Sequence, residues 1–137
     1  MSARVIYADA EPSGLASLLG GLIEQNLARD PARERLLKPS LVAITAPDAG
    51  VAVTLRIDAH RVVVIEGSDD AAAIEVSADS ARLLALTAAP LRFGLPDPLR
   101  PEGRAALLDV VSGRVNIRGL LTHLRGVARL TMLLSAR

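Results

Sequence analysis

The chain has 137 residues, a length that fits one domain with a buried core. Half of the residues are hydrophobic, but Tyr7 and Phe93 are the only aromatic ones, so Leu, Val, Ile and Ala must build the interior. The net charge is +1, with 16 basic and 15 acidic residues. This balance, together with the lack of aromatic stacking faces, argues against a nucleic-acid partner. The absence of cysteine excludes disulfides, thiolate nucleophiles and cysteine-ligated metals.

No secretory or membrane-spanning segment stands out in the sequence. The N-terminus has no apolar stretch behind a basic leader, and the longest uncharged apolar run, residues 14–23, is shorter than the roughly 20 residues that cross a bilayer. Lys38 is the only lysine, and this preference for arginine is typical of a GC-rich bacterial genome. We therefore expect a cytoplasmic, soluble protein that is one domain over residues 1–137.

The first predicted element is a helix that begins after an N-terminal extension, residues 1–12. Ser13 is the expected N-cap, and Pro31 is expected to end the helix near Asp30. Its apolar residues follow helical spacing; they are Leu15, Leu18, Leu19, Leu22, Ile23 and Leu27. Gly20 and Gly21 lie in the middle of this helix, where they indicate either close packing or a weak point on an exposed face.

From Leu41 onward the apolar residues alternate with a period of two, which predicts strands. The expected strands are 41–47, 51–58, 61–67 and 72–76. Short turns between them favour an antiparallel meander with one solvated face. Ser77 is then the expected cap of a helix that Pro90 ends, and a Pro/Gly-rich loop follows. The remaining expected elements are a helix at 105–112, a fifth strand at 114–119 and a helix at 120–135.

The final helix has little polar surface. Leu120, Leu124, Val127, Thr131 and Leu134 form one stripe, and other apolar residues widen it on both flanks. One sheet face cannot cover so broad a surface. The excess can be buried in an ordinary core, packed against another subunit, or used to roof a cavity that holds an apolar ligand.

Two motifs in order resemble the sterol carrier protein or non-specific lipid-transfer domain family. The first is a strand leading through Ser77 and Asp79 into a helix with Leu83 and Leu86. The second is a basic, glycine-bounded strand that feeds the final helix; its residues are Gly113, Arg114, Val115, Ile117, Arg118 and Gly119. The resemblance covers roughly residues 13–135.

This resemblance implies an α+β fold in which helices cover a five-stranded mixed, largely antiparallel sheet and enclose a hydrophobic tunnel. It also implies noncovalent binding of fatty acids, acyl-CoA esters, sterols or phospholipids. The chain departs from the family in its longer proline-rich segment, residues 90–102, and in its scarcity of Phe and Met.

We expect the opening and closing helices to face each other across the ligand, with one strand beneath them. The predicted ligand-binding residues are Leu15, Leu18, Leu22, Val53, Leu55, Leu124, Val127, Leu130 and Leu134. Gly119 and Gly126 are candidate points at which the last helix shifts during ligand entry. For each residue, plain core packing is the alternative reading.

The polar candidate residues are explained more simply by structural roles than by catalytic ones. Asp58 and His60 can share a strand face, with the histidine as a general base and the aspartate orienting it. The sequence offers no nucleophile to accompany them, so hydrogen bonding within a turn is the preferred interpretation. Asp69 and Asp70 fit a solvated turn, and His123 fits a core edge. The arginines of the loop could meet a carboxylate or phosphate head group; they are Arg92, Arg100 and Arg104.

The sequence therefore predicts a carrier of a hydrophobic small molecule or lipid, not an enzyme, with no cofactor and no metal. The alternative is an interaction module of the same fold whose core is filled and whose last helix dimerises. A homodimer and transient contact with a membrane surface remain open.

Overall fold

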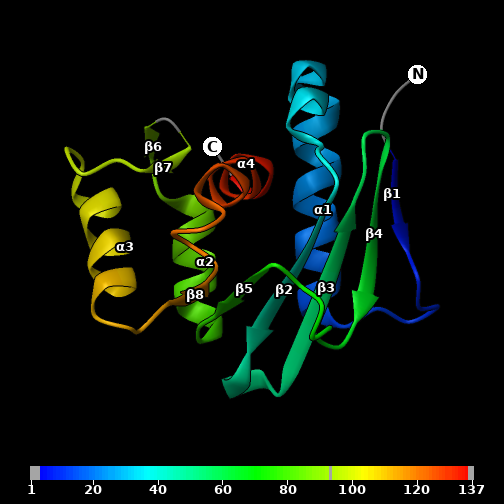
Figure 1. Ribbon diagram of the computed structural model, residues 1–137, viewed down its shortest axis with the longest axis horizontal. Coiled ribbons are helices and arrows are strands. Elements are labelled where there is room, and N and C mark those ends of the chain that lie inside the picture. The colour runs from blue at the N-terminus through cyan, green and yellow to red at the C-terminus, as the bar shows by residue number, and fades with distance from the viewer. Residues whose placement is uncertain (1–3, 93, 136–137) are drawn as a thin grey trace.

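The computed structural model describes residues 4–92 and 94–135. Within these residues the chain forms a six-stranded mixed sheet, a two-stranded ribbon and four α-helices (Figure 1). The strand order is β1-β4-β3-β2-β5-β8. Its strands are β1 (Arg4–Tyr7), β2 (Ser40–Ala46), β3 (Val51–Ile57), β4 (Arg61–Glu66), β5 (Ile74–Ser77) and β8 (Asn116–Arg118).

The mixed α+β fold expected from the sequence is confirmed, but the sheet has six strands and not five. The extra strand, β1, lies in the expected N-terminal extension and pairs in parallel with β4. The strands β2, β3 and β4 form the expected antiparallel meander. The meander ends there, because the chain passes from β4 across β3 and β2. The next strand, β5, then pairs in parallel with the free edge of β2. Beyond it, β8 pairs with β5 in antiparallel register.

The register places alternate apolar side chains of neighbouring strands together on the face of the sheet that the helices cover. Val42 lies opposite Leu55 on one side and Ile74 on the other, and Leu55 lies opposite Val64. All four are at most 2 % exposed. The opposite face is more polar, as expected, although Thr54 is buried there and its hydroxyl donates to the Gly67 carbonyl at 2.7 Å.

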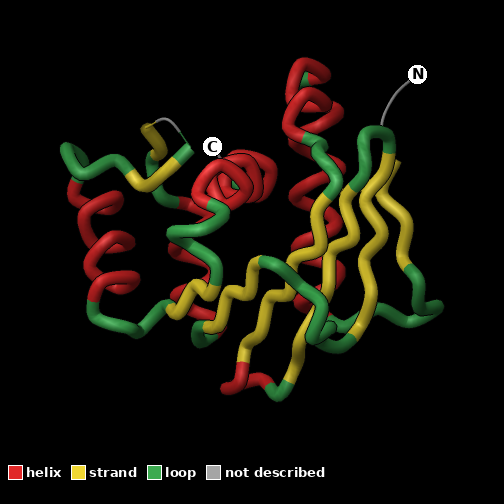
Figure 2. The backbone as a smooth tube through the Cα atoms, viewed as in Figure 1, coloured by secondary structure: helices red, strands yellow, loops and turns green. Residues whose placement is uncertain are grey.

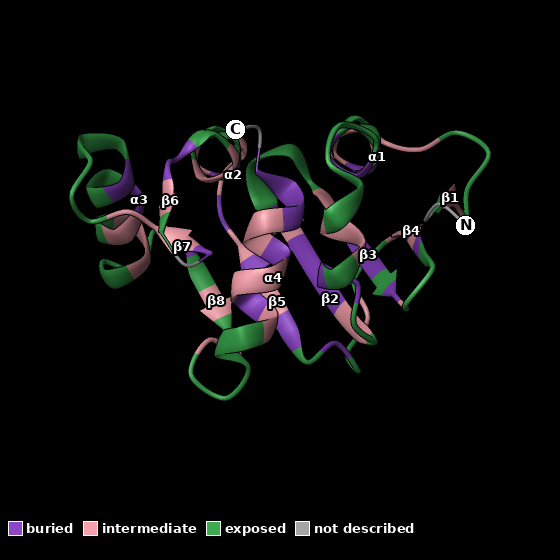
Figure 3. Cartoon of the chain, turned by 90° about the horizontal axis from the view of Figure 1, so that it is seen from above, coloured by how far each residue is buried: buried purple, intermediate pink, exposed green. Residues whose placement is uncertain are grey.

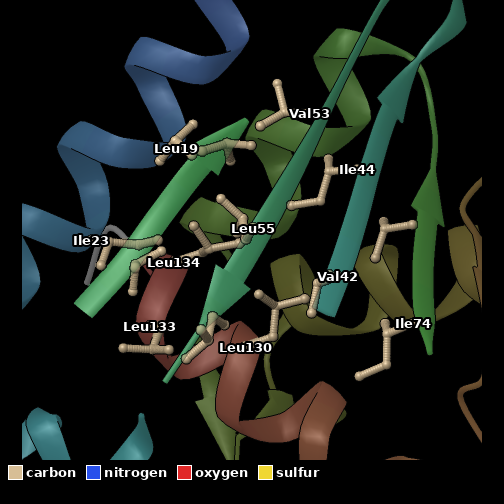
Figure 4. Close-up of a cluster of buried hydrophobic side chains, with 14 of the residues drawn as sticks. Leu19, Ile23, Val42, Ile44, Val53, Leu55, Ile74, Leu130, Leu133 and Leu134 are labelled. Atoms are coloured by element: carbon tan, nitrogen blue, oxygen red, sulfur yellow. The ribbon is translucent and has the colours of Figure 1, made fainter. Parts of the chain in front are cut away.

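The helix α1 (Gly14–Arg29) packs on the apolar face of the sheet beside the last helix, α4 (Leu124–Leu134). Ser13 caps α1 as expected, with its Oγ accepting from the Ala16 amide at 3.1 Å. A 3-10 helix, Pro31–Leu36, follows directly. Figure 4 shows side chains of α1, the strands and α4 meeting in one cluster, which makes this half of the molecule a continuous core.

The second half of the molecule contains the helices α2 (Ser80–Ala88) and α3 (Pro101–Val111). The cap of α2 is Asp79 and not Ser77, because Ser77 still pairs in β5 and the Ala78 amide donates to Thr45 in the neighbouring strand. The proline-rich segment folds into a small ribbon, β6 (Leu91–Arg92) and β7 (Leu95–Pro96). Figure 2 shows this ribbon leading into α3.

The last helix begins later than expected, at Leu124 and not near Leu120. Gly119 adopts a positive φ of 86° directly after β8. Residues 119–123 then form a turn, in which the His123 amide donates to the Gly119 carbonyl at 2.8 Å. In the described part of the chain, no helix is both long enough and apolar enough to span a membrane.

Candidate ligand-binding cavity

An apolar cavity of about 240 Å³ lies between α4, α2, α3 and the β2-β5-β8 side of the sheet. Segments from nine elements and turns contribute to its wall. The wall residues are Leu19, Ile44, Val76, Leu83, Leu86, Thr87, Leu95, Pro96, Leu107, Val110, Ile117, Leu120, Leu121, Leu124, Val127, Leu130, Thr131 and Leu134. Figure 1 shows the arrangement that creates it: α4 stands between α1 and the pair α2 and α3.

The wall offers almost no directional polar chemistry. Among its residues only Thr87 and Thr131 carry polar side chains. The Thr87 hydroxyl donates to the Leu84 carbonyl and the Thr131 hydroxyl to the Val127 carbonyl, each at 2.7 Å. Both hydroxyls are therefore bonded within their own helices. A water molecule needs two to four polar partners to be held in a cavity, so this space favours an apolar occupant over ordered water.

The mouth of the cavity lies where α4 begins. Leu121 and Leu124 are the wall residues, within the described chain, that are exposed to solvent, at 91 % and 46 %. Val127, one turn further along α4, is only 4 % exposed. The wall thus runs from a solvent-exposed rim at residues 121–124 to a buried interior deeper along the helix.

The structure brings four of the nine sequence-predicted site residues to this wall. All four lie on α4; they are Leu124, Val127, Leu130 and Leu134. Val53 and Leu55 are fully buried in the core below α1 and do not reach the cavity. Leu15 packs against the edge of the same core. Leu18 and Leu22 lie along a shallow depression on the outer face of α1.

The expected geometry needs correction for a simple reason: α1 and α4 pack directly against each other, so no room lies between them. Asn26 of α1 is 2 % exposed, and its Nδ2 donates to the carbonyls of Leu133 and Ser135 at 2.6 and 2.7 Å. The open space lies on the other flank of α4, toward α2, α3 and β8. Leu19 is the α1 residue that borders it.

Several wall residues were absent from the sequence-predicted site, although a signal for some of them existed. Leu83 and Leu86 of α2 and Ile117 of β8 belong to the two motifs of the family resemblance, and all three line the cavity. Leu107 and Val110 of α3 also line it. Their spacing of three residues places them on one helix face, but that pattern alone does not distinguish a cavity wall from ordinary core.

Charged side chains outside the cavity connect the two helices of its far wall. Arg82 of α2 forms an ion pair with Asp79 and approaches Asp109 of α3, with its Nε 3.6 Å from the Asp109 Oδ1. Arg114 lies 3.8 Å from the same oxygen. The pKa of Asp79 is lowered, chiefly because its carboxylate accepts the backbone amide of Arg82 and then by the Arg82 side chain. These groups hold α2 beside α3 without entering the cavity.

The other polar candidates are used in turns. The Asp58 carboxylate accepts the backbone amides of His60 and Arg61, both at 3.1 Å, and these bonds with the Arg61 side chain lower its pKa. The Asp69 carboxylate accepts the Ala71 amide in the same way, which is the turn chemistry expected. In the described residues no three His, Cys, Asp or Glu side chains gather in a group able to hold a metal ion.

The fold and cavity define a small α+β protein in which helices on a mixed sheet enclose apolar space. A solved structure described as a UbiJ-SCP2 ubiquinone synthesis protein is similar, with a TM-score of 0.59 and 17 % sequence identity. The match covers 88 % of this chain and 96 % of that one. The chain therefore has an SCP2-like fold, as the sequence motifs indicated. No family model matches the sequence, and no curated protein matches it.

Proposed function

We propose that this protein binds a hydrophobic molecule in the cavity beside α4 and carries it without covalent chemistry. The observation that supports the proposal most strongly is the cavity wall, which is apolar throughout except for two threonine hydroxyls bonded within their own helices. Such a wall recognises a ligand by shape and hydrophobicity. It supplies no acid, base or nucleophile, which agrees with a binding role.

The cavity is large enough for this role. An engineered apolar cavity of roughly 150 Å³ stays dry and binds benzene, and the space here is about 240 Å³. Each buried methylene group of a ligand gains about 0.8 kcal/mol, before the costs of association and ordering are subtracted. A flexible acyl or isoprenoid chain can therefore bind by its tail alone.

The exposed rim indicates how such a ligand is oriented. A charged or polar head group cannot be satisfied inside the wall, so it stays at the mouth near Leu121 and Leu124 while the tail enters. Fatty acids, acyl-CoA esters, sterols and phospholipids all combine a polar head group with an apolar portion, and they differ in the size of each. The name of the similar structure refers to ubiquinone synthesis, so a quinone with an isoprenoid tail belongs in the same ligand panel.

A pair of matched substitutions tests the proposal. Val127→Phe adds a ring to the cavity wall, where empty space can accept it, so we expect unfolding stability to stay the same or rise by about 0.5–2 kcal/mol. The same substitution should abolish uptake of a fluorescent fatty acid by the delipidated protein. The control, Val62→Phe, places the ring in the filled core, where overpacking costs about 1–3 kcal/mol.

Urea unfolding gives the stabilities, and fluorescence titration together with native mass spectrometry gives ligand binding. The proposal fails if the wild-type protein takes up no member of the panel and no lipid co-purifies with it. It also fails if Val127→Phe binds the fatty acid as tightly as the wild type does, because the ligand then lies elsewhere.

The structure supports the dimerisation alternative less well than the carrier function. Dimerisation requires the apolar stripe of the last helix to be free for a partner. Two members of that stripe, Val127 and Leu134, are at most 8 % exposed and belong to the core of the same chain, whereas Leu124, at 46 %, is its exposed member. The mass of the delipidated protein in solution checks this directly.

A further inference from the structure

The turn between β8 and α4 presents a leucine to solvent on a well-fixed backbone. Leu121 is 91 % exposed, the highest value of any large hydrophobic side chain in the described residues. The turn is closed by the bond from the His123 amide to the Gly119 carbonyl. Gly119 is packed so closely against the Ala73 carbonyl that a Cβ atom would not fit there. In Figure 3 this connector forms an exposed loop that projects away from α1 and α2.

The same leucine borders the cavity. Leu121 and Leu124 both line the cavity wall and both face solvent, so the rim and the interior form one continuous apolar surface. An isolated exposed leucine needs no explanation, but one at the rim of an apolar cavity does. Without such a leucine, an apolar molecule would have to cross a polar, solvated rim to reach the cavity.

The charge of this part of the chain complements an anionic surface. Residues 110–137 contain five arginines and no acidic residue, whereas residues 1–109 contain all 15 acidic residues and the other 11 basic ones. Arg118 and Arg125 flank the turn. Arg118 bonds to Glu75 at 2.9 Å, while Arg125 is exposed and forms no ion pair with the part of the chain that the structure describes. Asp69 and Asp70 lie in the turn that precedes β5, and Asp109 lies 3.8 Å from Arg114.

We propose that residues 118–125, which we term the docking turn, bind the surface of a lipid bilayer that contains anionic lipid. Leu121 enters the apolar boundary of the bilayer, and Arg125 contacts the lipid phosphates. Interfacial membrane binding usually combines these two contributions, apolar insertion and electrostatic attraction. Docking brings the cavity mouth against the bilayer, so that a tail passes from one apolar phase to another without crossing water. Only this loading step rests on the function proposed above.

The chain contains no tryptophan, so one introduced tryptophan reports on its own surroundings. Leu121→Trp places the reporter at the apex of the docking turn. The matched control is Leu18→Trp, on the outer face of α1, where the side chain is 37 % exposed. Each variant is mixed with vesicles of phosphatidylcholine alone or with phosphatidylglycerol added, and emission and co-sedimentation are recorded.

We expect a blue shift of the Leu121→Trp emission on anionic vesicles, and no shift of the Leu18→Trp emission. Arg125→Glu in the Leu121→Trp background should weaken vesicle binding about tenfold or more. Raising the salt from 0.1 to 1 M should weaken it as well, because the screening length falls from roughly 10 to 3 Å. Circular dichroism of each variant verifies that it is folded.

Three results overturn the inference: no blue shift with anionic vesicles, an equal shift of both reporters, or a shift without vesicles that follows formation of a dimer. Failure of the function proposed above gives a different result. In that case the Leu121→Trp variant docks on vesicles but the protein takes up no fatty acid. If the protein takes up fatty acid from solution and the reporter never shifts, the carrier function stands and the docking turn does not.

Discussion

Two neighbouring glycines in α1 show how differently one residue type can be used. Gly20 faces the ring of Tyr7 so closely that a Cβ atom would overlap it, whereas a Cβ atom on Gly21 would have no neighbour within 4 Å. Both readings suggested by the sequence are therefore correct, one for each residue. The sequence cannot assign them, because the assignment depends on the position of β1.

This difference predicts unequal effects for the same substitution. Gly21→Ala should stabilise the protein by about 0.8–1.0 kcal/mol, because alanine favours the helix and meets nothing. Gly20→Ala should stabilise it less or destabilise it, because movement of the Tyr7 ring offsets the gain in helix propensity. Burial, and then the charge of Glu24, raise the pKa of Tyr7, so displacement of the ring should also lower that pKa. Urea unfolding and ultraviolet titration of the tyrosine measure both effects, and equal stabilisation by the two variants would contradict the packing described here.

At the scale of elements, one buried side chain joins the first helix to the last. The carbonyls at the end of a helix lack intrahelical partners. Asn26 supplies a donor to two of them, Leu133 and Ser135, and Arg33 supplies another to Met132 at 3.1 Å. This contact fixes the end of α4 on α1 and thereby leaves the cavity on the opposite flank of α4.

Removing this contact should therefore weaken the whole assembly of α1 and α4. We expect Asn26→Ala to lower the free energy of unfolding by about 1–3 kcal/mol, because two buried carbonyls lose their donor. The neighbouring exposed residue gives the control: Gln25→Ala should change stability by less than about 0.5 kcal/mol. Urea unfolding of both variants provides the measurement. A result for Asn26→Ala within the range of the control would show that solvent or Arg29 replaces the bond.

Local sequence patterns predicted the positions of helices and strands better than they predicted which strands pair. Alternation in residues 41–76 and the stripe of α1 depend on neighbouring residues alone, and they located the helix and four strands closely. The pairing of β5 with β2 depends on where the chain crosses the sheet, which alternation does not encode. The late start of α4 follows from the turn at Gly119, which has a positive φ and lies too close to the Ala73 carbonyl for a Cβ atom.

Only part of the cavity wall was anticipated from the sequence, for a similar reason. The broad apolar surface of the last helix showed that something beyond one sheet face must lie against it, and four of its residues line the cavity. Which flank is filled and which is open depends on Asn26, a polar residue within a leucine-rich stripe. No periodicity of apolar residues reveals that role, so α1 and β3 were expected at the cavity and α2, α3 and β8 were not.

At the scale of the whole molecule, the two halves are built differently. One half joins α1 to the long strands β2, β3 and β4 in a continuous core. The other half surrounds the cavity with short elements: β5 has four residues, β8 three, and β6 and β7 two each. Short strands beside an unfilled space are held by few hydrogen bonds and packing contacts. The free energy of local opening should therefore be lower in this half than in the half built on β2 to β4.

Hydrogen exchange of the delipidated protein should therefore show strong protection in β2 to β4 and weak protection in α2, α3 and β8. A bound ligand stabilises only the states that hold it, so saturation with a fatty acid should slow exchange in the cavity half and leave the core half nearly unchanged. Val127→Phe should imitate part of this protection without ligand, because its ring fills the same space. Uniform slowing across both halves would instead mean that the ligand acts on global unfolding, and that the cavity half does not open by itself.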